Sequence, residues 1–342
     1  MSQDTPRIEV RNLVTLIDTP RGVVEPVSGI TLSVAPGETL GIVGETGSGK
    51  SVFVRSLMGL MPPGARYGQG SQVRIGPHEM TRLSPGQLRN IWGREIGLIP
   101  QDPATSLNPV RRIGAQLMDC ILRDPNIAPS QRRARAVELL SLVGISDPER
   151  RLEVYPHQMS GGMRQRVLIA IAIALSPGVL IADEPTTALD VTIQRQVLDL
   201  IQRLQEEVQT SVLLVSHDLA VVAGRSHRVG VMYSGRLVEL LDTASLLAGP
   251  RHPYTRGLLN SQAHHAPARE DLPTIPGEPP DIRNRPPGCP FAPRCPRASA
   301  LCQARMPEFT PLSPQGATGF ACHHPFEAGA QTSAAPVLRS VS

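Results

Sequence analysis

A glycine-rich segment near the N-terminus restricts the fold more than any other feature of the chain. Residues 44–51 read Gly-Glu-Thr-Gly-Ser-Gly-Lys-Ser, which fits the phosphate-loop pattern of Gly, four residues, Gly, Lys and Ser or Thr. An apolar stretch of strand type precedes the segment at residues 39–43, and a helical stretch follows at residues 50–59. Glycines let the main chain turn tightly and aim N–H groups inward, and a helix start adds partial positive charge. We therefore predict an α/β fold with an anion-binding loop between a strand and a helix.

Lys50 stands out because it is the single lysine among 34 basic residues. A compact ammonium fits against β and γ phosphates, where the wider, planar guanidinium of arginine fits poorly. Ser51 supplies a hydroxyl to the Mg²⁺ that bridges the same phosphates. The predicted nucleotide-binding residues are Gly44, Glu45, Thr46, Gly47, Ser48, Gly49, Lys50, Ser51 and Val52.

Two adjacent carboxylates follow a second apolar stretch. Residues 179–182 read as a buried strand that ends at Asp183 and Glu184. We predict that Asp183 holds Mg²⁺ and that Glu184 polarises the water that attacks the γ-phosphate. The alternative is an ordinary solvated acidic turn after a strand.

Short apolar runs alternate with helical patterns through the body of the chain, as expected for a largely parallel sheet covered by helices. The segment 191–208 has apolar residues three and four apart, from Ile193 to Val208, which predicts an amphipathic helix. The other predicted elements are strands at 39–43, 179–182 and 212–215, antiparallel strands at 8–16 and 30–34, and a helix that Ser130 opens and Gly144 ends.

The last part of the chain differs in composition. Of the 34 prolines, 17 lie after residue 249, and four of the five cysteines lie there too. We therefore place a boundary near residue 245, between a body at 1–245 and a Pro- and Cys-rich extension at 246–342.

The motifs occur in an order that resembles the ATP-binding subunit of ABC transporters. The phosphate loop, Gln101, Ser160-Gly161-Gly162, Asp183-Glu184, Ala188-Leu189-Asp190 and Ser216-His217-Asp218 follow one another along about residues 8–245. The resemblance implies a P-loop NTPase of the ABC type with an antiparallel β subdomain and a helical subdomain at about 102–165. It also implies a head-to-tail dimer that closes on ATP.

The resemblance also assigns roles to residues outside the loop. Ser160, Gly161 and Gly162 at a helix start would cap the γ-phosphate held by the partner's loop. Gln101 would touch Mg²⁺ or the attacking water, and His217 would hydrogen-bond the γ-phosphate. The remaining residue, Asp190, would touch the opposite subunit.

Further segments are similar to the oligopeptide/dipeptide importer branch, which also includes nickel importers. They are residues 101–109, 252–255 and 275–280 and the form Ser-Gly-Gly-Met-Arg-Gln-Arg. In that branch the ATPase pairs with a sister ATPase, energises two membrane permeases and depends on an external solute-binding protein. The resemblance thus implies peptide import from the cytoplasmic face of the inner membrane.

One departure concerns adenine. The family has an aromatic ring upstream of the phosphate loop, near Ile17 here, but no Tyr, Phe or Trp occurs before Phe53. We therefore expect adenine to rest on an aliphatic side chain.

Four cysteines in the extension suggest a metal centre. Cys289, Cys295, Cys302 and Cys322 have five, six and nineteen residues between them, gaps that fit an iron–sulfur cluster at least as well as zinc. Similarity to the importer branch favours a [4Fe–4S] cluster, with zinc or free thiols as alternatives. His323 and His324 are competing ligands or exposed loop residues, and Cys120 is predicted to be a small core residue.

Several classes of protein are excluded or disfavoured by composition. The longest apolar run, residues 167–175, is too short for the roughly 20 residues that cross a bilayer, and the N-terminus has no secretory signal pattern. A net charge of +4 and a pI near 9.0 leave open a soluble ABC-type ATPase acting on nucleic acid or ribosomes. We do not expect a nucleic-acid partner, because no long basic block or heptad run occurs.

Overall fold

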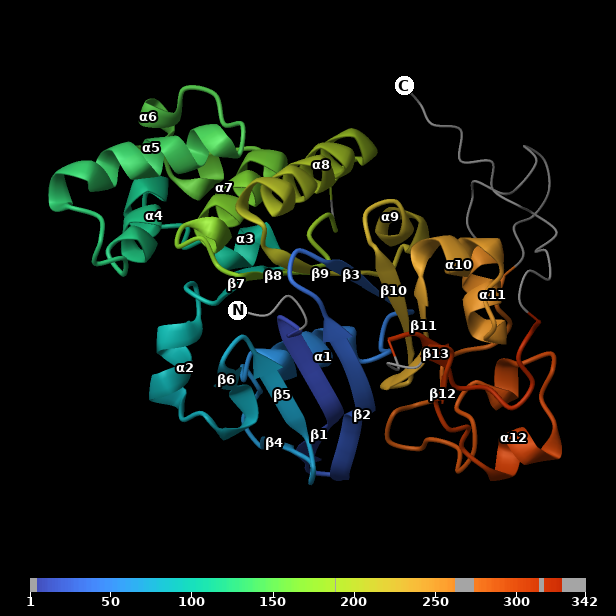
Figure 1. Cartoon of the computed structure of the whole chain (residues 1–342). Coiled ribbons are helices and arrows are strands. Elements are labelled where there is room, and N and C mark those ends of the chain that lie inside the picture. Colours follow the sequence, from blue (N-terminus) through green and yellow to red (C-terminus); the bar gives the residue numbers. More distant parts are fainter. Residues whose placement is uncertain (1–4, 188, 262–273, 314–316, 328–342) are drawn as a thin grey trace. The chain divides into compact units, whose positions relative to one another are not determined.

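The computed structural model describes residues 5–187, 189–261, 274–313 and 317–327 (Figure 1). The chain divides into two compact units. Ala188, part of one predicted motif, lies outside the described residues. Unit 1 comprises Met1–Ile8, Val34–Glu38 and Arg74–Val215, and unit 2 comprises Glu9–Ser33, Thr39–Val73 and Ser216–Ser342.

The core of unit 1 is a parallel sheet. Strand β8 (Val179–Asp183) lies between β7 (Ile96–Ile99) and β9 (Ser211–Ser216). Nearly all of their residues are buried, which explains why the sequence shows continuous apolar runs instead of alternation. The strands predicted at 179–182 and 212–215 are confirmed. A short hairpin of β5 (Gln72–Ile75) and β6 (His78–Glu79) precedes this sheet along the chain.

The chain between β7 and β8 is helical, and Figure 1 shows α4, α5 and α6 grouped beside α7. Unit 1 also contains 3-10 turns at η1 (Met80–Arg82), η2 (Pro129–Gln131) and η3 (Pro156–Gln158). Its helices are α2 (Pro85–Ile91), α3 (Pro103–Ser106), α4 (Ile113–Ile121), α5 (Arg132–Leu142), α6 (Pro148–Arg151), α7 (Gly161–Ile173) and α8 (Val191–Val208).

Two helix predictions can be compared with the structure in detail. The amphipathic helix is confirmed as α8, although Val208 is 40% exposed at its last turn. Helix α5 ends before Gly144, whose φ of 72° is the left-handed conformation common after a helix. The predicted start at Ser130 is wrong, because Ser130 lies in the preceding 3-10 turn η2 and Gln131 is the cap residue.

Unit 2 contains two sheets. In one, β3 (Thr39–Val43) runs parallel to β10 (Arg228–Tyr233), and β11 (Arg236–Asp242) runs antiparallel to β10. The short strands β13 (Gly319–Phe320) and β12 (Thr310–Pro311) extend this sheet beyond β11, so residues from both sides of position 245 form one sheet.

The second sheet of unit 2 is antiparallel. Its strands include β1 (Ile8–Thr19), β2 (Gly22–Val34) and β4 (Ala65–Tyr67). They confirm the antiparallel strands predicted at 8–16 and 30–34, which are longer than the apolar pattern indicated. The helical segments of unit 2 are α1 (Lys50–Leu57), α9 (Leu219–Ala223), α10 (Thr243–Ala248), α11 (Pro253–Asn260), η5 (Ala292–Arg294) and α12 (Ala300–Ala304).

Candidate functional site

The predicted phosphate loop joins the end of β3 to the start of α1. Gly47 and Gly49 have φ angles of 82° and 99°, a region that side-chain-bearing residues rarely adopt. At Gly44 a Cβ atom would lie 2.3 Å from the carbonyl oxygen of Met232, so only glycine fits there. The first N–H groups of an α-helix have no acceptor within the helix, and in α1 these belong to the end of the loop. The loop therefore has the shape and the donors of an anion cradle.

Lys50 lies on the inner side of this loop. Its ammonium donates to the carbonyl oxygens of Gly44 at 2.8 Å and Glu45 at 3.2 Å, and the residue is only 5% exposed. The hydroxyl of Ser48 is also buried and has no hydrogen-bond partner among the described residues. A buried cation beside an unsatisfied hydroxyl and a helix start is suited to bind a polyphosphate.

The loop is supported by residues that are distant in the sequence. The N–H of Gly235, in the turn between β10 and β11, donates to the carbonyl oxygen of Ser48 at 2.8 Å. The N–H of Glu45 donates to the hydroxyl of Tyr254 at 2.9 Å, and its carboxylate accepts from Arg294 at 2.8 Å. The sequence analysis missed Tyr254 and Arg294 as loop contacts, because no local pattern joins positions about 200 or more residues apart.

In unit 1, the predicted catalytic carboxylate follows β8. Glu184 has φ 49°, a strained conformation for a residue with a side chain, and strained positions are frequent at functional sites. Its Oε2 accepts from Nε2 of Gln101 at 3.2 Å and from the hydroxyl of Thr187 at 3.0 Å. The structure thus brings Gln101 and Glu184 together, and it adds Thr187, which the sequence analysis did not name. Asp183 is the half-buried last residue of β8.

The Ser-Gly-Gly motif begins α7. Ser160 is the N-cap, and its hydroxyl oxygen accepts from the N–H of Met163 at 3.3 Å. Gly161 and Gly162 form the first turn, and a Cβ on Gly162 would come within 2.8 Å of the Ile193 side chain. The motif therefore gives an exposed helix start and also allows α7 to approach α8 closely.

Asp190 and His217 lie at the ends of other elements. Asp190 is the N-cap of α8, and its carboxylate accepts from the N–H of Ile193 at 2.9 Å. His217, in unit 2, is exposed directly after β9, beside Asp218, which caps α9. Asp190 thus has a structural role in its own chain, and the predicted contact with a second subunit stays a prediction.

The position predicted for adenine stacking carries no ring. Ile17 in β1 is half-buried and pairs with Ala65 in β4. Tyr67, opposite Thr15 on the same two strands, donates its hydroxyl to the carbonyl oxygen of Ser56. An aliphatic adenine contact at Ile17 stays a prediction.

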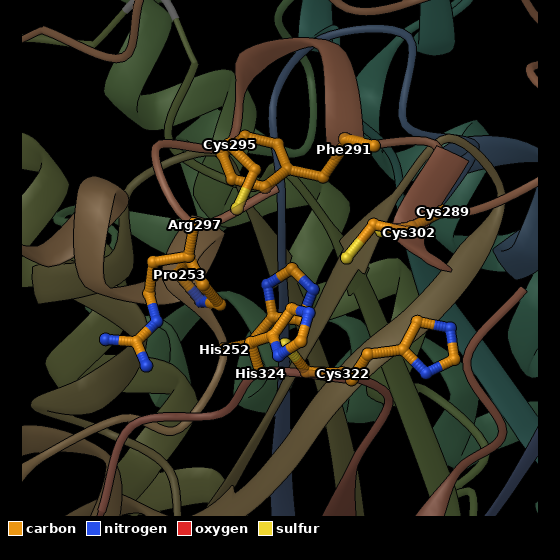
Figure 2. Close-up of a pocket in the computed structure, with 11 residues that line it drawn as sticks. His252, Pro253, Cys289, Phe291, Cys295, Arg297, Cys302, Cys322 and His324 are labelled. Carbon is orange, nitrogen blue, oxygen red and sulfur yellow. The ribbon is translucent and has the colours of Figure 1, made fainter. Parts of the chain in front are cut away.

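The four cysteines of the extension line one small pocket in unit 2 (Figure 2). Figure 2 shows Cys295 on one side, Cys289 and Cys302 on the other, and the rings of His252 and His324 between them. All five cysteines of the chain are free thiols. Burial raises the pKa of Cys289 and Cys295, and it raises the pKa of Cys322 to about 11.

Two histidines predicted as exposed loop residues lie at the cysteine pocket. His323 and His324 are half-buried and line the pocket, so their interpretation as exposed loop residues is wrong. Nε2 of His324 is 2.7 Å from the hydroxyl of Ser299, and Nε2 of His323 donates to the carbonyl oxygen of Arg305 at 2.9 Å.

Neither a metal nor a cluster is shown by this geometry. Within the four described stretches of the chain, no three His, Cys, Asp or Glu side chains form an arrangement that would hold a metal ion. The chemistry of the donors, thiols with imidazoles, is that of zinc and iron–sulfur proteins. Outside this pocket, Cys120 on α4 is half-buried, and burial raises the pKa of its thiol.

The strand, glycine loop and helix of unit 2 have the form of the phosphate loop of nucleoside triphosphatases. Strand β8 of unit 1 ends in two adjacent carboxylates, which this class of enzyme uses as well. Known proteins narrow this class. The family model for ABC transporters matches residues 27–187, and the model for the oligopeptide/dipeptide transporter C-terminal region matches residues 238–302.

Close relatives span most of the chain. The dipeptide transport ATP-binding protein DppD of Bacillus subtilis is 45% identical over 88% of this chain and 90% of its own length. DppD of Escherichia coli is also 45% identical, over 88% and 91%. The ATP-binding cassette MJ0796, solved as a dimer in a post-hydrolysis state with ADP and Pi, has a TM-score of 0.62 and 25% identity over 69% of this chain and 98% of its own.

The chain therefore belongs to the ATP-binding proteins of ABC transporters, in the oligopeptide/dipeptide group. ATP is its substrate, and hydrolysis of ATP is its activity. Among the helices that the structure describes, none combines the length and apolar character needed to span a bilayer.

Proposed function

We propose that this chain hydrolyses ATP to drive the import of peptides through an ABC transporter. The C-terminal family match at residues 238–302 and the dipeptide relatives support this choice of cargo. The observation that carries the ATPase half of the proposal is the phosphate loop with Lys50 on its inner side. No observation favours the alternative of an ATPase that acts on nucleic acid or ribosomes.

In the proposed mechanism, the loop binds the phosphates of ATP. Main-chain N–H groups at the end of the loop and the start of α1 face the phosphate chain, while the N–H of Glu45 stays with Tyr254. Lys50 exchanges its carbonyl partners for β and γ phosphate oxygens. Mg²⁺, when bound, neutralises charge on these phosphates, and Ser51, Gln101 and Asp183 are the residues we propose to hold it.

Glu184 is the proposed general base. A carboxylate at this position accepts a proton from the attacking water while Gln101 and Thr187 hold its Oε2 in a fixed direction. These two donors keep the carboxylate in one orientation, which suits it to accept the proton from water. His217 is proposed to hydrogen-bond the γ-phosphate and stabilise the charge that develops there.

The proposal includes a dimer. The hydroxyl of Ser160 accepts from Met163, so its own proton is free to be donated outward, and we propose that it reaches the γ-phosphate on a sister ATPase together with the N–H groups of Gly161 and Gly162. Asp190 is proposed to contact that sister subunit. The remaining proposed partners are two permeases and, through them, an external solute-binding protein. We therefore propose that the chain lies at the cytoplasmic face of the membrane.

The experiment that tests this function is peptide uptake by proteoliposomes. The chain would be reconstituted with two permeases, a sister ATPase and a solute-binding protein of a peptide importer from the same organism, with ATP inside. We expect uptake of labelled di- or oligopeptide that needs ATP and stops with Glu184→Gln. Nickel uptake without peptide uptake, or ATP hydrolysis that responds only to nucleic acid, would overturn the proposed cargo.

We also propose that the extension, residues 246–342, holds a [4Fe–4S] cluster on Cys289, Cys295, Cys302 and Cys322. Support comes from the four thiols lining one pocket and from their soft donor chemistry. Protein purified without oxygen should contain about four iron and four sulfide per chain and be brown. Stoichiometric zinc without iron, or no metal at all, would reject the cluster.

A further inference from the structure

Glu45, the second residue of the phosphate loop, is held by residues from the far end of the sequence. Its carboxylate accepts from Nη1 of Arg294 at 2.8 Å, and its N–H donates to the hydroxyl of Tyr254 at 2.9 Å. Its carbonyl oxygen accepts from the ammonium of Lys50 at 3.2 Å. Any movement of Glu45 therefore moves an atom that orients Lys50.

Arg294 is fixed much more firmly than a surface arginine. Only 6% of its side chain is exposed, against 24% for Glu45. Its Nε donates to the carbonyl oxygen of Pro276 at 2.8 Å, and its Nη1 also donates to the hydroxyl of Tyr233 at 3.2 Å. Exposed ion pairs contribute little to stability. When one partner of a desolvated pair is removed, the other charge stays buried without a counter-charge, which is unfavourable.

The same residues border the cysteine pocket. Arg294 directly precedes Cys295, and Phe291 lines the pocket within the same short loop. The Phe291 ring packs on Tyr233 and Tyr254 with centroid distances of 5.3 Å in both cases. The ring of Phe291 thus contacts both Tyr254, which holds the N–H of Glu45, and Tyr233, which accepts from Arg294.

We propose that Arg294 is a positioning residue for ATP binding, which holds Glu45 so that the phosphate loop keeps its binding shape and which links that shape to the cysteine pocket. The inference rests on the proposed binding of ATP phosphates by the loop. It adds that Arg294, about 250 positions after Glu45, supports the nucleotide site. Because Arg294 acts through Glu45, it changes affinity for ATP and leaves the chemical step alone.

The first test is nucleotide binding by the full-length chain. Arg294→Ala should raise the Kd and KM for ATP about tenfold, with kcat within about twofold of the parent, because a charge-assisted contact is lost. Arg294→Lys keeps the positive charge but lacks the several planar N–H donors of the guanidinium, so it should recover part of the affinity for ATP. The matched control is Arg283→Ala, which removes an exposed arginine paired with Asp281. Thermal unfolding of each variant without nucleotide shows whether it folds.

A double-mutant cycle tests whether Arg294 acts through Glu45. Glu45→Ala should also raise the Kd for ATP. The Kd of the double variant should be no higher than that of the weaker-binding single variant. A folded Arg294→Ala with unchanged Kd, or additive effects in the cycle, overturns the proposal. Lys50→Ala separates this failure from failure of the proposed function: if Lys50→Ala loses ATP and Arg294→Ala does not, only the positioning role is wrong.

The link to the pocket is tested with Cys295→Ser, and with Phe291→Leu as a second variant where the first does not fold. Each should raise the Kd for ATP in the parent chain and have no further effect in the Arg294→Ala chain. An equal effect in both chains, or no effect in either, would show that the pocket does not act through Arg294.

Discussion

The phosphate loop of unit 2 and the carboxylate end of β8 in unit 1 both follow a buried strand, yet they are built differently. The loop is shaped by the main chain: glycines with positive φ, carbonyl oxygens that hold Lys50, and an N–H from Gly235. At the end of β8 two side chains, Gln101 and Thr187, hold the carboxylate of Glu184. The difference suggests that the first region binds ATP and the second acts on it.

The largest expected effect separates chemistry from binding. Glu184→Gln should lower ATP turnover about a thousandfold, because water activation is lost, while the Kd for ATP stays within about twofold. Phosphate release and equilibrium binding measure the two quantities. The control, Glu138→Gln, changes an exposed carboxylate on α5 and should keep full turnover. Equal turnover in Glu184→Gln and the parent would break the comparison.

The next effect concerns the loop. Lys50→Ala should weaken ATP binding about a hundredfold, because the buried ammonium is the loop's charged donor to the phosphates. Lys50→Arg should also lose tight binding, since the larger planar group does not fit the same space. Titration with a fluorescent ATP analogue measures both, and an unchanged Kd in either variant contradicts the proposed role.

A carboxylate in unit 2 contrasts with Glu184 and affects stability. Glu239 is fully buried and accepts from the N–H of His252 at 3.2 Å, and burial raises its pKa from 4.5 to about 7. The folded chain therefore keeps a proton that the unfolded chain releases between pH 4.5 and 7. The free energy of unfolding consequently falls as the pH rises through this window and levels off above it, by about 3 kcal/mol in all.

Glu239→Gln should remove this fall, because glutamine has no proton to release. Urea unfolding at pH 5 and pH 8 measures the change relative to the parent, which cancels the contribution of other titrating groups. Glu308→Gln, an exposed position, is the control and should keep the parent's pH dependence. The same loss of stability from pH 5 to pH 8 in Glu239→Gln would contradict the assignment.

The smallest expected effect sharpens the account of Glu184. Thr187→Val should lower kcat about tenfold with little change in KM, because it removes one of the two donors to the carboxylate. Gln101→Ala should lower kcat in the same way and also raise KM, since Gln101 is a proposed Mg²⁺ ligand. Steady-state kinetics separates kcat from KM, and a change confined to KM would mean that these residues bind ATP instead of positioning the base.

Local sequence patterns were sufficient for much of the fold and for the form of the phosphate loop. The loop, the strand before it and the bounds of α8 follow from spacing within about 20 residues. The predicted helix start at Ser130 is wrong because Ser130 lies inside a 3-10 turn that begins at Pro129, and the type of a cap residue does not distinguish such a turn from an α-helix. The contacts of Tyr254 and Arg294 with Glu45 do not follow from the sequence, because they form only through tertiary packing, which no short pattern encodes.

The most direct test of the account is equilibrium binding of ATP to two full-length variants prepared side by side. Glu184→Gln should bind ATP as tightly as the parent, with one nucleotide per chain, and Lys50→Ala should bind none at the same concentration. If the two variants bind ATP alike, the division between a binding loop and a catalytic carboxylate is wrong.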